Sequence, residues 1–163
     1  MERFIQSKIK LDQTVEQTWK LISTPGMLEQ VHPFCKENKV VFWGEQHEKK
    51  DLLIYLNGLE YYREFTSWNA FKGYELKIGK EKGKKSRVVW EISARQEKSE
   101  LKITVFPYES DKISKLIYFW AFQFYIRPLL KRYLNNVLKG IKWHLDKNEK
   151  VPRNQFGTHP WFS

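Results

Sequence analysis

Arg63 is the residue whose type and position best suit recognition of a small molecule. It lies in a predicted strand, 59–68, that a two-residue turn at Asn57-Gly58 joins to another predicted strand, 52–56. On the apolar face of such a hairpin a guanidinium group needs a partner, because an unpaired buried charge is costly. Arg63 would then hold a carboxylate, a phosphate or a carbonyl oxygen of a ligand.

The register of this hairpin decides which side chains accompany Arg63. A two-residue turn sets Leu52 opposite Arg63, and side chains alternate between the two faces along each strand. One face therefore carries Leu52, Ile54, Leu56, Leu59, Tyr61 and Arg63, and the other carries Asp51, Leu53, Tyr55, Glu60, Tyr62 and Glu64. Two alternatives remain for the arginine: an exposed strand end, or neutralisation by an internal carboxylate such as Glu75 or Glu91.

The motifs that mark common enzymes do not occur in the sequence. There is no Gly-x-Ser-x-Gly, no P-loop, no Gly-x-Gly-x-x-Gly and no His-Glu-x-x-His. The four histidines lie far apart, without the spacing of metal ligands: His32, His47, His144 and His159. With Cys35 as the single cysteine, we expect no disulfide, no metal site and no cofactor. An enzymatic reaction would depend on Arg63 with Tyr61 or Tyr74, to polarise a carbonyl group and move a proton.

Composition indicates one folded domain. The 163 residues are 41% hydrophobic and 29% charged, which is typical of a globular protein with a sizeable core. The net charge of +10 is spread along the chain, and its densest cluster, 80–87, is explained by a solvated hairpin tip, so we expect no nucleic-acid partner. Residues 1–8 lack the apolar run of a signal peptide, which predicts a cytoplasmic protein.

Hydrophobic periodicity predicts the elements that position these side chains. A half-buried strand at 2–11 precedes two short helices near 15–23 and 27–31. A period of two then predicts further strands near 40–43, 52–56, 59–68, 74–78, 88–94 and 101–105. A helix near 129–145 follows, with a buried stripe of Leu134, Val137, Leu138 and Ile141. Pro128 predicts a kink or break just before this helix, since proline lacks an amide hydrogen and crowds the preceding turn.

One-sided alternation in six or seven strands requires a cover on the apolar face, and the helix near 129–145 is the one element long enough to supply it. The sequence therefore predicts an α+β helix-grip fold. In this fold a curved antiparallel sheet of six to seven strands wraps around a long C-terminal helix, with two short helices after the first strand. We expect a single domain at 1–147, followed by a C-terminal tail at 148–163.

Three stretches carry a resemblance to a known superfamily: Val15-Glu-Gln-Thr-Trp-Lys-Leu-Ile-Ser-Thr-Pro-Gly-Met-Leu28 followed by His32-Pro33, Asn57-Gly-Leu-Glu-Tyr-Tyr-Arg-Glu64, and Trp90 with Leu101-x-Ile-x-Val-x-Pro107. Over residues 3–147 the chain resembles the START-related helix-grip proteins, also called SRPBCC or polyketide cyclase/dehydrase-like proteins. The resemblance implies a cavity between sheet and long helix that holds a hydrophobic small molecule, such as a lipid, a quinone or a polyketide. The expected ligand-binding residues are Arg63, Tyr61, Ile54, Phe65, Tyr74, Leu76, Trp90, Ile103, Leu134 and Leu138.

The resemblance leaves the function open between classes. Binding or carriage of a hydrophobic ligand is the first hypothesis, a cyclase-like enzyme is the second, and a protein or membrane interaction module is the third.

The apolar segment 116–126 is too short to span a bilayer, which needs about 20 residues. It has three interpretations: it closes the cavity, contacts a second chain in a homodimer, or makes a transient contact with a membrane surface. An interfacial helix should keep a polar face, and Gln123 is the one polar side chain within the segment, so cavity closure or a second chain is preferred. We also expect the tail 148–163 to dock back through Phe156, Trp161 and Phe162.

Overall fold

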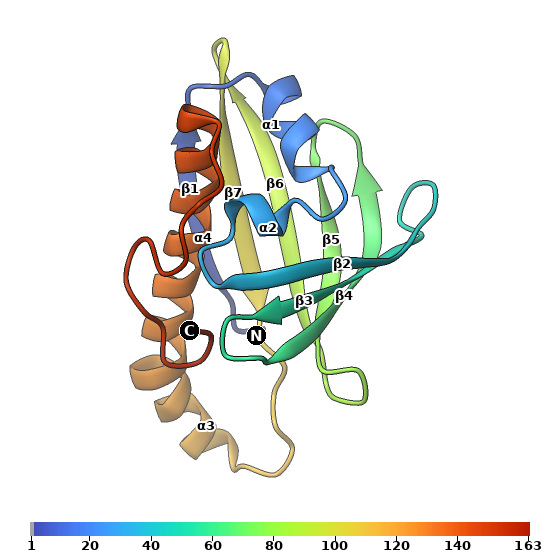
Figure 1. Cartoon of the computed structure of the whole chain (residues 1–163). Helices are drawn as coiled ribbons and strands as arrows, with labels where there is room; N and C mark the ends of the chain where they lie inside the picture. The colour runs from blue at the N-terminus through green and yellow to red at the C-terminus, as the bar shows by residue number, and fades with distance from the viewer. Residues whose placement is uncertain (1) are drawn as a thin grey trace.

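One curved antiparallel sheet grips a long helix in this protein. In the computed structural model, which describes residues 2–163, the seven strands follow the spatial order β1-β7-β6-β5-β4-β3-β2. The strands are β1 (Ile5–Leu11), β2 (Cys35–Trp43), β3 (Lys49–Tyr55), β4 (Glu60–Asn69), β5 (Gly73–Gly79), β6 (Ser86–Arg95) and β7 (Lys98–Phe106). The helices are α1 (Val15–Ile22), α2 (Leu28–Val31), α3 (Lys115–Ala121), the π-helical turn η1 (Phe122–Ile126) and α4 (Arg127–Lys147). Figure 1 shows α4 running alongside β1 while the rest of the sheet curves away from it, which confirms the predicted helix-grip arrangement.

Local sequence signals set the start of α1. The Thr14 hydroxyl accepts a hydrogen bond from the amide of Gln17 at 3.2 Å, and the Gln17 side chain accepts one from the Thr14 amide at 2.9 Å. This reciprocal capping box satisfies two amides that the first helical turn leaves free. The helix buries Trp19 and Ile22 against the sheet, and the chain then turns at Gly26, whose φ of +73° favours glycine.

The apolar stripe of α4 is buried as its periodicity predicts. Leu134, Val137, Leu138 and Ile141 are at most 3% exposed and belong to one hydrophobic cluster with the inner face of the sheet. A Cβ on Gly140 would lie 2.0 Å from the carbonyl oxygen of Val31. The helix therefore passes so close to the end of α2 that glycine is required there.

The predicted break before Pro128 is present as the π-helical turn η1. The amide of Arg127 donates to the carbonyl of Phe122, five residues back, in place of the α-helical partner four residues back. Because Pro128 cannot donate to the preceding turn, it sits in the first turn of α4, where its missing amide hydrogen is tolerated. In Figure 1 the chain changes direction between α3 and α4 at this point.

The β3–β4 hairpin differs from the prediction by one residue. Asp51 lies opposite Arg63, and the amide of Tyr55 donates to the carbonyl of Leu59 at 2.9 Å. The loop therefore has three residues and ends at Gly58, whose φ of +89° is the left-handed conformation of a bulged turn. The predicted two-residue turn is wrong, and because side chains alternate, the shift moves every β3 side chain to the other face.

Residues 148–163 pack back onto the folded chain. The amide of Val151 donates to the carbonyl of Gln30 in α2 at 2.9 Å. Phe162 is 5% exposed and stacks on Tyr55, with ring centroids 4.3 Å apart. The segment therefore lies against both α2 and β3 (Figure 1).

Candidate ligand cavity

A cavity of about 790 Å³ lies between the inner face of the sheet and α4. This volume is within the range of small-molecule sites, which are mostly apolar with a few polar groups. The strands contribute Leu53, Leu76, Val88, Trp90, Ile103 and Val105, and the helices contribute Leu28, Leu130, Leu134 and Val137. Its polar lining includes the buried side chains of His32, Tyr55 and Arg63 and the half-buried side chain of Tyr133.

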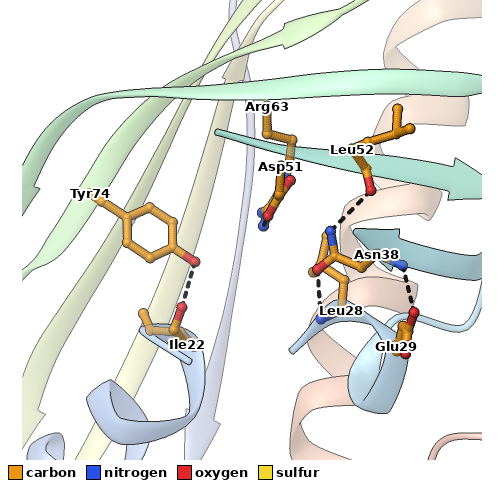
Figure 2. A network of polar contacts seen from close by, with 8 residues as sticks. All are labelled: Ile22, Leu28, Glu29, Asn38, Asp51, Leu52, Arg63 and Tyr74. Carbon is orange, nitrogen blue, oxygen red and sulfur yellow. Dashed lines mark hydrogen bonds and ion pairs between the residues drawn. The ribbon is translucent and has the colours of Figure 1, made fainter. Parts of the chain in front are cut away.

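Six of the ten predicted ligand-binding residues line this cavity: Tyr61, Arg63, Leu76, Trp90, Ile103 and Leu134. Phe65, Tyr74 and Leu138 are buried in the surrounding core instead. The hydroxyl of Tyr74 donates to the carbonyl of Ile22 at 3.1 Å, as Figure 2 shows, so it is held by α1. Ile54 lies on the opposite face of β3, because the loop has three residues and Leu53 takes the inward position.

Arg63 forms a two-point ion pair with Asp51 across the hairpin, and the two side chains overlap in the view of Figure 2. Its Nε donates to Oδ1 at 2.8 Å and its Nη2 to Oδ2 at 2.5 Å, with the two side chains 5% and 0% exposed. Burial by itself lowers the pKa of Arg63, but the charge and hydrogen bonds of Asp51 raise it above its ordinary value. The pair is thus ionised and neutral as a unit.

An internal carboxylate neutralises Arg63, which is one of the two alternatives given by the sequence. The residue is Asp51, however, and not the suggested Glu75 or Glu91. Glu75 lies 3.6 Å from Arg87 and Glu91 lies 2.9 Å from Lys102, in ion pairs that are at least one-third exposed. Asp51 was assigned to the outer face because the predicted register was shifted by one residue.

A guanidinium group has five N–H donors, and Asp51 accepts from two of them. Arg63 also lines the cavity, whereas Asp51 does not. The arginine is therefore able to offer further N–H groups to a molecule in the cavity, while its charge is already balanced.

A second polar group, formed by His32, Tyr133 and Tyr55, lies in the same wall. His32 Nδ1 accepts a hydrogen bond from the amide of Phe34 at 3.1 Å, so its proton is on Nε2, 2.7 Å from the Tyr133 hydroxyl. The Tyr133 and Tyr55 hydroxyl oxygens are 3.0 Å apart. Three donor protons serve two hydrogen bonds, and one hydroxyl proton is left for a further acceptor, whichever tyrosine provides it.

Burial keeps this second group neutral. It lowers the pKa of His32 to about 3, with the charge of Arg63 acting in the same direction. Burial also raises the pKa of Tyr55 and of Tyr133 above their ordinary values. At neutral pH the imidazole and both hydroxyls are uncharged, so together with Arg63 they present hydrogen-bond donors to the cavity.

Asn38 fixes the position of α2, and with it His32. Its side chain accepts from the amide of Leu28 at 3.4 Å and donates to the carbonyl of Leu52 at 3.3 Å, and its own amide donates to Glu29 at 2.9 Å (Figure 2). These bonds join the short helix to β2 and β3.

The open end of the cavity lies among exposed residues of the β5–β6 turn and of the loop between β7 and α3. Lys84 in the turn forms an ion pair with Asp111 in the loop and donates to the carbonyl of Glu109 at 3.1 Å. Tyr118 and Ala121 of α3 and Ile126 of η1 also line the cavity. One side of the segment 116–126 therefore lines the cavity beside its open end, which agrees with the first of its three interpretations.

Several residues of this site were not among the predicted ligand-binding residues. Tyr133 lies on α4 between positions of the apolar stripe, and Tyr55 and Asp51 were assigned to the outer face of the hairpin. Phe162 reaches the wall from a segment 107 residues away along the chain from Tyr55, and no periodicity could signal that contact. The signal for the ion pair is the alternation of side chains along the hairpin, which places Asp51 and Arg63 on one face when the register has a three-residue loop.

Within residues 2–163 no group of three or more His, Cys, Asp or Glu side chains could hold a metal ion. Across the same residues, no helix is both long and apolar enough to cross a membrane.

Solved structures share this architecture at low sequence identity. A START superfamily protein from Mycobacterium smegmatis matches with a TM-score of 0.69 at 9% identity, over 89% of this chain and 98% of that one. Ara h 8.0201 matches with a TM-score of 0.64 at 12% identity, over 91% of this chain and 100% of that one. DynU16, a putative protein in the dynemicin biosynthetic locus, matches with a TM-score of 0.67 at 10% identity, over 92% of this chain and 49% of that one. No protein-family model matches the chain, and no curated protein matches it.

The chain has a helix-grip fold similar to those of these structures, as its sequence resemblance implied. At 9–12% identity these likenesses establish the fold and leave the function to the site.

Proposed function

We propose that the protein binds or carries a hydrophobic small molecule whose head is a neutral, hydrogen-bond-accepting oxygen group. The observation that supports this proposal is Arg63, which lines an apolar cavity of about 790 Å³ while Asp51 balances its charge. A ketone, quinone, ester or ether oxygen accepts the remaining N–H donors without adding charge. A carboxylate would bring a second negative charge next to an arginine that Asp51 already neutralises, and its desolvation would be poorly repaid.

The His32, Tyr133 and Tyr55 group supports the same head chemistry. It has one donor proton in excess and its imidazole is neutral, so it too favours an acceptor. The apolar lining of Leu76, Trp90 and similar side chains then accommodates the hydrocarbon part of the ligand.

A cyclase-like reaction is the weaker candidate. It would need a base beside the reacting carbon, yet both His32 nitrogens take part in hydrogen bonds and the Tyr74 hydroxyl is held by the Ile22 carbonyl. Of the polar pair first considered, Arg63 and Tyr61 remain at the cavity. Two such groups could bind or polarise a carbonyl oxygen. Carriage needs only this binding, whereas catalysis also needs a base.

The first experiment is native mass spectrometry of the purified protein, followed by organic extraction, to identify a co-purifying molecule. The second measures displacement of a fluorescent probe by 2-dodecanone, dodecanoate and dodecane. We expect 2-dodecanone to bind more tightly than dodecane by about 5–10-fold, since one hydrogen bond contributes about 1 kcal/mol. Dodecanoate should bind more weakly than the ketone.

Matched variants separate the head from the chain of the ligand. Ile78, a half-buried lining residue, is replaced by tryptophan to fill the cavity, and Ile78→Trp should weaken all three molecules. The double variant Arg63→Met, Asp51→Val removes the ion pair as a unit and should reduce the preference for the ketone while retaining dodecane binding. Tighter binding of dodecanoate than of 2-dodecanone by the parent protein would overturn the neutral-head proposal. If Ile78→Trp leaves the affinity for all three molecules unchanged, the cavity is not the binding site.

A further inference from the structure

The outer side of α3 and η1 is a stripe of exposed apolar side chains. Leu116, Trp120 and Phe124 follow one another at steps of four residues and are 68%, 54% and 73% exposed, and Ile117 beside them is 63% exposed. The rings of Trp120 and Phe124 are stacked, with centroids 5.5 Å apart. In Figure 1 this part of the chain projects beyond the sheet, at the N-terminal end of α4. We call Leu116, Ile117, Trp120 and Phe124 the aromatic face.

The opposite side of the same helix is attached to the protein. Tyr118 and Phe122 are buried at 7% and 3%, and the guanidinium of Arg3 lies 5.0 Å from the Tyr118 ring centre. The Tyr118 hydroxyl donates to the carbonyl of Tyr108 at 3.3 Å. The protein itself covers this side of the segment, so the exposed side can meet a membrane although the segment has few polar side chains.

Positive charge surrounds the aromatic face. Residues 112–145 contain seven Lys and Arg residues and no Asp or Glu, so this stretch supplies most of the net charge of +10. Lys112 and Lys115 precede the face, and Arg127, Lys131 and Arg132 follow it, all of them exposed. None of these five forms an ion pair with another residue in 2–163.

We propose that the aromatic face docks on an anionic lipid membrane. Tryptophan, phenylalanine and leucine partition into the boundary between head groups and acyl chains, and flanking Lys and Arg side chains attract anionic lipid. A second copy of the chain is the less suitable occupant. A two-fold axis through this face would bring the basic residues that flank it in the two copies, Lys115 and Arg127, close together, and like charges repel.

The docking surface adjoins the cavity. Lys112 and Tyr118 line the cavity, while Leu116 and Trp120 on the same segment point outward. Docking would therefore bring the open end of the cavity to the lipid surface, where a hydrophobic ligand is dissolved. This last step rests on the proposed function, whereas the docking itself does not.

The test is co-sedimentation of the full chain with vesicles of phosphatidylcholine alone and of phosphatidylcholine mixed with phosphatidylglycerol. We expect binding to the mixed vesicles that weakens as salt is added. Trp120→Ser with Phe124→Ser should weaken it by more than tenfold, about the effect of losing two buried aromatic side chains. Lys115→Gln and Arg127→Gln should each weaken it about fivefold, from the typical contribution of one basic residue near an anionic surface.

The control is Val41→Ser with Phe42→Ser, another exposed apolar pair, on β2, which should leave vesicle binding unchanged. All these side chains are exposed, so melting temperatures should match that of the parent protein. Equal binding to both kinds of vesicle, or no loss in the Trp120 and Phe124 variant, would overturn the proposal. So would a dimer in solution that this variant converts to a monomer. The variant Ile78→Trp should bind vesicles as the parent protein does although it binds the cavity ligands more weakly. Vesicle binding and ligand binding are therefore tested independently of each other.

Discussion

Replacing Arg63 by methionine should destabilise the protein strongly, because it removes one partner of a buried ion pair. The change leaves Asp51, which is 0% exposed, without the two hydrogen bonds at 2.8 and 2.5 Å that balance its charge. Breaking a buried ion pair by removal of one partner costs about 3–5 kcal/mol. For a chain of this size, about 2–4 °C per kcal/mol gives a fall in melting temperature of about 10 °C.

The assay is thermal and denaturant unfolding at neutral pH of the parent, the Arg63→Met variant and the Arg63→Met, Asp51→Val variant. The double variant should recover most of the lost stability, because apolar side chains that fill the space of a buried ion pair are usually tolerated. The control is Lys98→Met, which breaks an exposed ion pair with Asp12 and should change the free energy of unfolding by no more than about 1 kcal/mol.

Two results would refute this reasoning. If Arg63→Met melts within a degree or so of the parent, the carboxylate is not stranded and the pair is not buried as the structure shows. If the double variant is no more stable than the single one, the loss comes from the packing of Arg63, whose guanidinium lies 5.3 Å from the Phe65 ring centre, and not from Asp51.

The remaining predictions concern other parts of the molecule. The pKa of His32 falls from 6.5 to about 3 on folding, so its contribution disfavours the folded state as the pH drops below 6.5. Between pH 7 and 4.5 the parent protein should therefore lose about 3 kcal/mol of unfolding free energy through this residue. Denaturant unfolding should show no such loss for His32→Gln and the same loss as the parent for the exposed control His47→Gln. Gly140→Ala should lower the free energy of unfolding by about 1–3 kcal/mol despite the better helix propensity of alanine, since its Cβ would overlap the Val31 carbonyl; an unchanged melting curve would contradict the close approach. Phe162→Ala should cost about 3–5 kcal/mol and expose the cavity wall, and unchanged stability would show that residues 148–163 are not docked in solution.

The sequence determined most of the fold because the signals were local and repeated. Alternation at every second residue marked the strands, and the stripe of Leu134, Val137, Leu138 and Ile141 marked the buried side of α4. The capping residues at Thr14 and the break before Pro128 also followed from local chemistry. One-sided strands then needed a cover, and one helix was long enough to provide it.

The tertiary structure alone decided which side chains of the β3–β4 hairpin face the cavity. Asn57-Gly58 is compatible with a two-residue turn and with a bulged three-residue loop, and the two differ in local energy far less than in what they bury. The observed loop buries Leu53 and Tyr55 against distant elements and pairs Asp51 with Arg63, which are gains that no local pattern contains.

The same limit applies to the segment 116–126 and to residues 148–163. Apolar residues on all sides of a short helix show that something covers it, but not which side the protein covers itself. That depends on Arg3, Tyr108 and the start of α4, which meet the segment only in the folded chain. Phe162 likewise joins Tyr55 and Tyr133 because the chain returns across α2, and a contact between residues so far apart in sequence is set by packing and not by periodicity.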